Sequence, residues 1–307
     1  MTTLVFTHEA CLTHDPGRHH PESPERLRAV LAALAAPEFA RLERREAPRA
    51  ELDDLQRVHP RAFVERLLAQ VPPQGHAAID ADTVLSPGSG EAALRAAGAN
   101  IAAVAAVMAG EATNAFCAVR PPGHHAEPLH AMGFCLFNNV AIAAAVARAR
   151  GAARVAVVDF DVHHGNGTQA IFEDDPHLFY GSTHQYPLYP GTGAKSETGV
   201  GNIVNAPLRP NAGSAEFRNA FNEFILPALE DFRPDFVLIS AGFDAHRADP
   251  LAQLNLVEAD FAWATERLVE LAGRHCRGRI VASLEGGYDL EALAASAAAH
   301  VAALMAA

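Results

Sequence analysis

Cysteine is scarce in this chain, and the few cysteines follow no binding pattern. They stand far apart, without a CxxC pair, at Cys11, Cys117, Cys135 and Cys276. This spacing argues against a disulfide framework and against a cysteine-built zinc site, and it is typical of a reducing compartment. The N-terminus has no basic segment followed by a long apolar stretch, so no secretory signal is expected. We therefore expect a cytoplasmic protein.

Positive charge is outweighed by negative charge. The chain has 24 lysines and arginines against 36 aspartates and glutamates, which gives a net charge of −12. This balance argues against a nucleic-acid partner. Solubility alone explains it, although it is also compatible with a cationic substrate.

Long hydrophobic runs are missing as well. The most apolar helical segment, residues 96–110, is bounded by Arg95 and Glu111, so it is shorter than the roughly 20 residues that a membrane span requires. We expect a buried helix there and no membrane partner. No linker rich in proline or serine divides the chain, and residues 1–307 are predicted to form a single domain.

Motifs of covalent catalysis and of nucleotide binding are also absent. The chain has no GxSxG sequence, and no cysteine stands in the context of a nucleophile. The segment PGTGAKS at 190–196 lacks the glycine spacing of a phosphate-binding loop. These absences favour a water nucleophile activated by a metal ion.

The chain does contain a regular alternation of two segment types. Short, almost entirely apolar runs are typical of strands buried on both faces, and the stretches between them have helical spacing. The alternation predicts an α/β fold with a mostly parallel sheet flanked by helices on both faces. We expect strands at 4–7, 115–119, 154–158, 178–182, 236–240 and 280–284, and helices at 23–34, 91–108, 140–150, 214–229, 258–272 and 291–307.

Four segments rich in glycine and in chemically active residues follow these strands. Ligands of open α/β sheets gather at the carboxyl ends of the strands, so we expect the four segments to meet there. They are RPPGHHA (120–126), DFDVHHGNG (159–167), AGFDAH (241–246) and EGGYD (285–289).

The second segment predicts part of a metal site. Asp159, Asp161 and His163 fall on alternate residues after an apolar stretch, so on a strand all three side chains share one face. His164 would then point to the other face, as a structural histidine. Asp244 follows another apolar strand and is a candidate third ligand, with a helix cap as its alternative role. Aspartate and histidine without cysteine suit a divalent ion such as zinc.

The other segments supply candidate catalytic groups. His124 and His125 follow a turn of two prolines and a glycine that can present both rings to a cleft, where they could act on a metal-bound water. Adjacent histidines in an ordinary turn are the alternative. Tyr288 follows two glycines, and its phenol could donate a hydrogen bond to an oxyanion.

Taken together, the motifs resemble the histone deacetylase superfamily, and most closely its class II and bacterial deacetylase-like amidohydrolases. The resemblance covers nearly the whole chain and implies the single-domain arginase/deacetylase fold. It rests on HPESPER (20–26), DADTVLSPGS (80–89), RPPGHHA, GFCLFNN (133–139), DFDVHHGNGTQ (159–169), PGTG (190–193), SAGFDAHRADPL (240–251) and LEGGYDL (284–290).

The resemblance implies a role for each matched residue in a hydrolysis that releases acetate. Asp161, His163 and Asp244 would bind one Zn²⁺, and Tyr288 would polarise the substrate carbonyl. His124 and His125 would be the acid/base pair, oriented by Asp159 and Asn166. Because an amide carries no negative charge, Asn166 should leave His125 less basic than a carboxylate would.

Less central roles are implied in the same way. Gly133, Phe134, Tyr189 and Leu251 would line a narrow channel for an acyl-lysine side chain. Arg26 would assist the departing acetate, with a structural salt bridge as its alternative. A structural K⁺ ion would be bound by Asp159, Asp161, His163, Ser182 and Thr183.

Three functions remain open on this resemblance. The first is hydrolysis of acetyl-lysine in proteins or peptides, which Leu251 favours because polyamine-selective relatives have an acidic residue there. The second is an acetylpolyamine amidohydrolase, in which a homo-oligomer can restrict access. The third is an acyl-lysine binding module that retains zinc without catalysis, against which the intact Tyr288, His124 and His125 argue.

Overall fold

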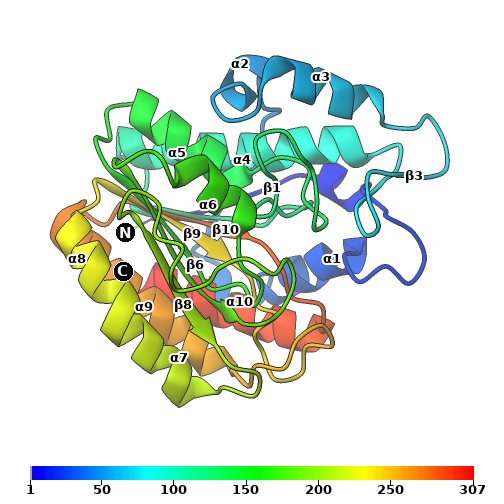
Figure 1. Ribbon diagram of the computed structural model, residues 1–307. Coiled ribbons are helices and arrows are strands. Elements are labelled where there is room, and N and C mark those ends of the chain that lie inside the picture. Colours follow the sequence, from blue (N-terminus) through cyan, green and yellow to red (C-terminus); the bar gives the residue numbers. More distant parts are fainter. Residues whose placement is uncertain (1) are drawn as a thin grey trace.

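A single eight-stranded sheet forms the centre of the molecule, in the order β2-β1-β5-β10-β9-β6-β7-β8. A computed structural model describes residues 2–307 (Figure 1). All neighbouring strands of this sheet run parallel, so the expected mostly parallel sheet is confirmed. The strands are β1 (Thr3–Thr7), β2 (Glu43–Glu46), β5 (Asn114–Cys117), β6 (Val155–Asp159), β7 (Leu178–Gln185), β8 (Ile203–Leu208), β9 (Phe236–Ala241) and β10 (Ile280–Leu284); β3 (Ala77–Ala78) and β4 (Val84–Leu85) form a separate antiparallel pair.

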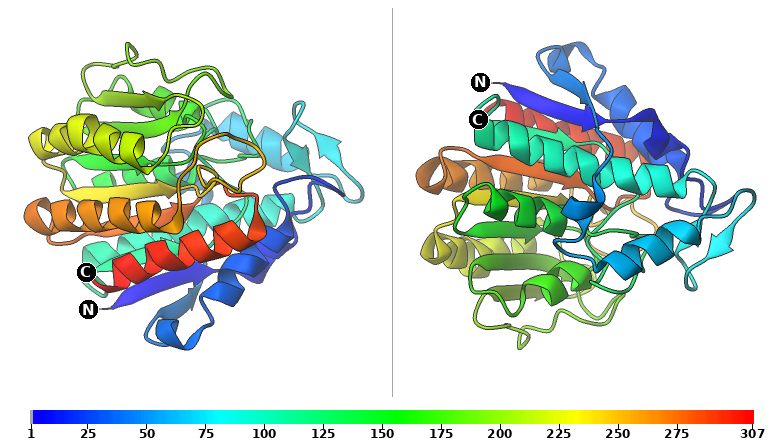
Figure 2. Two further views of the ribbon diagram at one scale, coloured as in Figure 1. Left: turned by 90° about the horizontal axis from the view of Figure 1, so that it is seen from below. Right: turned by 90° about the horizontal axis from the view of Figure 1, so that it is seen from above.

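Helices cover both faces of the sheet. Figure 2 shows α4, α5 and α6 on one face, with α2 and α3 outside them, and α7 to α10 on the other, where α1 packs beside α10. The helices are α1 (Pro24–Ala33), α2 (Leu52–Leu55), α3 (Arg61–Ala69), α4 (Ser89–Ala109), α5 (Asn139–Ala149), α6 (Asn166–Phe172), α7 (Ser214–Ala220), α8 (Leu226–Phe232), α9 (Glu258–His275) and α10 (Leu290–Met305), with short 3₁₀ turns at Glu9–Leu12 and Pro37–Phe39.

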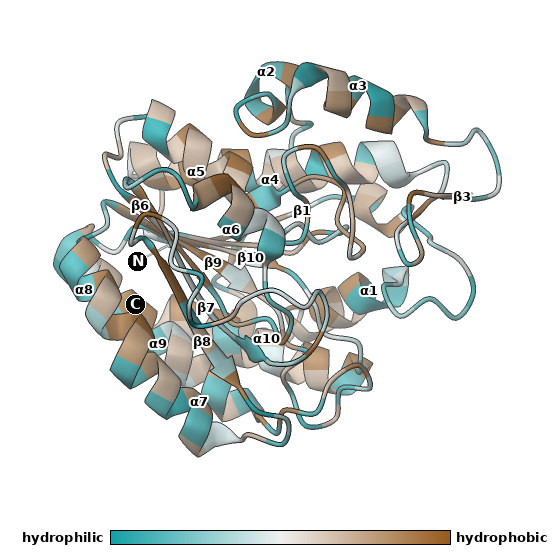
Figure 3. Ribbon diagram, viewed as in Figure 1, coloured by the Kyte–Doolittle hydropathy of each residue, from teal (hydrophilic) through white to brown (hydrophobic). Residues whose placement is uncertain are grey.

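Burial separates the strands that the sequence predicts from those it misses. The central strands β5, β6, β9 and β10 are buried along their whole length, as their apolar sequences predict. The edge strand β2 reads ERRE and is mostly exposed, so it carries no apolar pattern. Charged residues of this kind hinder the pairing of an edge strand with another sheet. Figure 3 shows both hydrophilic and hydrophobic segments along the outer helix α7.

The expected length of the most apolar helix was wrong. α4 spans 21 residues and is long and apolar enough to cross a membrane by length and composition alone. However, 67% of its most apolar window is buried inside the protein, where α4 packs against α5 and β5. A buried core helix satisfies the same criteria, so the interpretation as a buried helix stands.

Two further boundaries differ from the prediction. The helix expected at 214–229 is divided by a π-helical segment, Phe221–Ile225, that joins α7 to α8. Strand β6 ends at Asp159, so Asp161 and His163 lie in the following loop and do not share a strand face with it. The prediction that the three side chains share one strand face was therefore wrong, although the loop still brings them to the sheet edge.

Candidate metal and catalytic site

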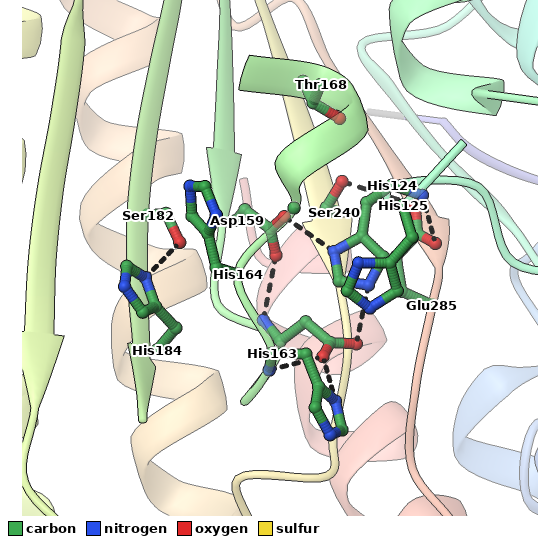
Figure 4. A network of polar contacts seen from close by, with 12 residues as sticks. His124, His125, Asp159, His163, His164, Thr168, Ser182, His184, Ser240 and Glu285 are labelled. Carbon is green, nitrogen blue, oxygen red and sulfur yellow. Dashed lines mark hydrogen bonds and ion pairs between the residues drawn. The ribbon is translucent and has the colours of Figure 1, made fainter. Parts of the chain in front are cut away.

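The four polar segments meet because their strands are neighbours in the sheet. β5, β10, β9 and β6 lie side by side and run parallel, so the loops that follow them leave the same edge. Figure 4 shows His124 and His125 close to Asp159 and Glu285, with His163 on the loop after β6. The predicted convergence is confirmed.

Asp161, His163 and Asp244 form a compact set of metal-binding groups. Their ligand atoms lie within 4.8 Å of one another. His163 Nδ1 is 3.2 Å from Asp161 Oδ1 and 3.1 Å from Asp244 Oδ2. Two buried carboxylates this close together are costly unless a positive charge neutralises them. No helix begins at Asp244 in residues 2–307, so its alternative role as a helix cap is wrong.

The backbone shapes a cradle for these carboxylates. Gly286 N donates a hydrogen bond to Asp161 Oδ2 at 2.8 Å, and Val162 N donates one to Asp244 Oδ1 at 2.8 Å. A Cβ at Gly242 or at Gly286 would overlap the carboxylate oxygens. The glycines therefore leave room for a ligand set of two oxygens and one nitrogen, which fits a small divalent ion.

The loop after β6 also orients His164 as expected. Its ring nitrogens contact Thr192 Oγ1 at 2.8 Å and Gln169 Oε1 at 2.9 Å. Burial and the nearby ring of His184 lower the pKa of His164 to about 3. His164 is therefore a neutral, hydrogen-bonded structural histidine.

The tandem histidines have different partners. His124 Nδ1 is 2.9 Å from Asp159 Oδ2, whereas His125 Nδ1 is 2.8 Å from Asn166 Oδ1. The two rings lie 4.0 Å apart between centroids. The predicted pairings of each histidine are thus present, one with an acid and one with an amide.

These surroundings give the two rings different charge states. Burial opposes a charge on His124, but the carboxylates of Asp161 and Asp159 outweigh it and raise its pKa to about 10. Burial, followed by the positive charges of His124 and His163, lowers the pKa of His125 well below its usual value. The tandem pair therefore consists of one cationic and one neutral imidazole.

A cavity of about 240 Å³ opens beside the histidines and the metal-binding set. Gly133 has φ +56, and a Cβ there would lie 2.5 Å from His125 Cδ2, so the wall needs a glycine. Burial raises the pKa of Tyr288 well above its usual value, so its phenol stays protonated and can donate. All four predicted channel residues are among the lining residues: Gly133, Phe134, Tyr189 and Leu251, together with Asp82, His125, His163, Leu188 and Tyr288.

Comparison with known proteins places this chain in a family. The profile described as histone deacetylase domain matches residues 20–304. The chain belongs to the histone deacetylase family. Its relatives in this family are named as deacetylases and amidohydrolases, so the chain is a hydrolase of this kind.

The similarity to individual family members extends over nearly the whole chain. An Archaeoglobus fulgidus protein named as a probable deacetylase is 41% identical, covering 95% of this chain and 82% of that protein. A Pseudomonas aeruginosa histone deacetylase-like amidohydrolase is 42% identical, and the match covers 94% of this chain and 82% of that protein. The crystal structure of the HDA15 HD domain superposes with a TM-score of 0.95 at 40% identity, and the match covers 99% of this chain and 88% of that domain.

Sequence reasoning missed two buried carboxylates beside this site. Glu285 is buried, and its Oε2 accepts hydrogen bonds from Gly123 N at 2.6 Å and His124 N at 3.2 Å. Asp249 Oδ2 accepts one from Tyr288 N at 2.7 Å. Both residues stand inside the motifs that were recognised, and a carboxylate directly after the apolar strand β10 was a usable signal for Glu285.

Arg26 lies under the loop that carries Tyr288. Its guanidinium is fully buried and donates to Gly287 O at 2.6 Å and to Glu22 Oε1 at 3.0 Å. It also lies 4.8 Å from the centroid of the Tyr288 ring. These contacts match the alternative reading as a structural salt bridge, and contact with acetate stays a prediction.

The residues expected to bind potassium lie on neighbouring strands and the loop after β6. β6 pairs with β7 so that Asp159 stands opposite Ser182. Ser182 Oγ is 2.9 Å from His184 Nδ1, and Thr183 Oγ1 is buried without a hydrogen-bond partner among residues 2–307. The potassium site stays a prediction.

Proposed function

We propose that the protein is a zinc-dependent deacetylase that hydrolyses acetyl-lysine in proteins or peptides. One observation carries this proposal: the cavity has Phe134 and Tyr189 in its walls and is bordered by His125, His163 and Tyr288. Aromatic walls suit the tetramethylene chain of an acylated lysine, because they cover apolar surface without binding charge. The amide would then reach the reactive groups.

The metal-binding set fits zinc by its donor chemistry. Asp161, His163 and Asp244 would hold the ion, and three protein ligands are typical of a catalytic site. When bound, zinc would act as a Lewis acid on the substrate carbonyl and lower the pKa of water. A structural K⁺ ion bound near Ser182 and Thr183 is part of the same proposal.

The protein's own groups would then move the protons. His125 is neutral and would accept a proton from the attacking water, while Tyr288 donates a hydrogen bond to the carbonyl oxygen as that oxygen becomes negative. A protonated histidine of the pair would return a proton to the amine nitrogen as the C–N bond breaks. The products are acetate and the free amine.

An acetylpolyamine is the second candidate substrate, and one observation favours it. Asp82 lines the cavity, and the negative charges of Asp82 and Asp80 add to burial in raising the pKa of the Tyr189 phenol. Carboxylates at this position would attract the distant amine of an acetylated polyamine. Leu251, also in the wall, supplies no charge and favours acetyl-lysine.

A comparison of substrates tests the proposal. The zinc-loaded protein would be given an acetyl-lysine peptide and N-acetylputrescine, and kcat/KM would be measured from acetate release. We expect hydrolysis of both compounds with preference for the peptide. A strong preference for N-acetylputrescine would show that the substrate is an acetylpolyamine and not an acetyl-lysine peptide. Binding of the peptide without acetate release would show that the protein is a non-catalytic acyl-lysine binding module.

A further inference from the structure

Glu127 lies in the turn that follows the tandem histidines, and its carboxylate faces Asn166. Glu127 Oε1 accepts a hydrogen bond from Asn166 Nδ2 at 2.8 Å. The turn closes on itself, because Glu127 N donates to His130 O at 2.9 Å. It is also supported by His59, whose Nδ1 lies 3.2 Å from Pro128 O. The main chain of Glu127 is therefore held independently of Asn166.

The carboxylate determines which way the Asn166 amide points. An ionised glutamate can only accept hydrogen bonds, so the NH₂ group of Asn166 must face it. The sulfur of Met132, a weak acceptor, lies on the same side at 3.4 Å. The amide oxygen is left to face His125 Nδ1. With the amide reversed, two oxygens would oppose each other at a residue that is only 6% exposed.

The orientation of the amide in turn determines the tautomer of His125. Because Asn166 Oδ1 can only accept, His125 Nδ1 must carry the proton. The tautomer follows from these hydrogen bonds alone. The Nε2 atom of His125 therefore retains a lone pair, which a general base requires. The carboxylate of Glu127 thus determines the tautomer of His125 through Asn166, without direct contact between the two side chains.

We propose that Glu127 is a positioning residue that sets the tautomer of His125 through the orientation of the Asn166 amide. The functional consequence rests on the proposed function, in which His125 is the base. The tautomer itself is a property of the resting protein and can be measured without substrate.

A reversal and a rescue test this proposal. Glu127→Lys replaces an acceptor with a donor, so Asn166 should turn its oxygen to the lysine and its NH₂ group to His125. The His125 proton should then move to Nε2. Adding Asn166→Asp to this variant places an acceptor on both sides, which should return the proton to Nδ1.

The direct readout is the ¹⁵N chemical shift of both His125 ring nitrogens at neutral pH, assigned with the His125→Gln variant. We expect Nδ1–H in the wild type, Nε2–H in Glu127→Lys and Nδ1–H in Glu127→Lys/Asn166→Asp. In parallel, kcat should fall about 100-fold in the single variant and recover in the double variant, with KM unchanged.

Two results would overturn the proposal: retention of Nδ1–H in Glu127→Lys, or failure of Asn166→Asp to restore it. If Glu127→Lys does not fold, Glu127→Met takes its place; it should show both tautomers, and Asn166→Asp should again select Nδ1–H. A wild type that hydrolyses no amide would refute the proposed function, yet the tautomer measurements would still decide the role of Glu127.

Discussion

The Nδ1 atom of His124 lies 2.9 Å from Asp159 Oδ2, and both side chains are buried. Tyr180 donates to the same carboxylate oxygen at 3.0 Å. Because the carboxylate favours the charged imidazole, Asp159→Asn should lower the pKa of His124 from its value of about 10. We expect kcat to fall about 100-fold or more, as for the loss of an acid/base group.

The pH dependence of kcat tests whether Asp159 raises the pKa of His124. If the reaction needs His124 as the cation, kcat decreases as pH rises through its pKa. The alkaline limb should therefore move to lower pH in Asp159→Asn. An unchanged limb would show that Asp159 only supports the loop after β6.

Tyr288 is predicted to act on the reaction and not on the fold. Tyr288→Phe keeps the ring at the cavity and removes the hydroxyl, so kcat should fall about 100- to 1,000-fold, as when one oxyanion donor is removed. Zinc content and melting temperature should stay as in the wild type. Tyr186→Phe is a control outside the cavity lining, and equal losses in both variants would contradict the assignment.

Gly133→Ala tests the contact between the channel wall and the base. The new Cβ would lie 2.5 Å from His125 Cδ2 in a backbone with φ +56, so the ring or the wall must move. We expect a destabilisation of about 1–3 kcal/mol and a loss of kcat. Gly75→Ala is the matched control: Gly75 also has a positive φ, +70, but a Cβ there would meet no atom of residues 2–307 within 4 Å apart from its chain neighbours. Unfolding by urea measures the first effect, and equal losses of kcat in the two variants would contradict the contact.

His300 should make the fold sensitive to acid. Burial lowers its pKa to about 3, and its Nδ1 contacts Thr265 Oγ1 at 2.6 Å. The unfolded chain binds a proton near pH 6.5, so the free energy of unfolding should decrease as pH falls from about 6.5 to 3. His300→Asn, whose amide can replace the Nδ1 donor, should show a shallower decrease. The free energy of unfolding would be measured with urea at each pH, and an equal decrease with pH in the wild type and in the variant would contradict this role.

The sequence predicted the elements that determine where the site lies. β5, β6, β9 and β10 have apolar, fully buried sequences, and each is followed by polar residues, so their shared edge could be inferred. The strand β2 could not be, because ERRE at a sheet edge has the composition of a surface segment. β8 was missed for a related reason, since it includes Pro207 and is only partly buried.

The metal-binding residues were predicted correctly, but the strand geometry from which they were predicted is not the one observed. Asp161 and His163 reach Asp244 through a loop, because β6 stops at Asp159, and alternation along a strand played no part. Glu127 and Glu285 were missed because each matters through the hydrogen bonds that its carboxylate accepts. Asn166 and Gly123 approach them only after the chain has folded, and a single sequence does not show such pairs.

Titration of the metal-stripped protein with zinc tests the central claim most directly. Acetate release from an acetyl-lysine peptide would be measured at each addition, together with the zinc bound per chain. We predict no hydrolysis without metal and a rise that reaches its plateau at one zinc per chain, with Asp244→Ala binding none at the same concentration. Full hydrolysis by the stripped protein, or by Asp244→Ala, would contradict the account.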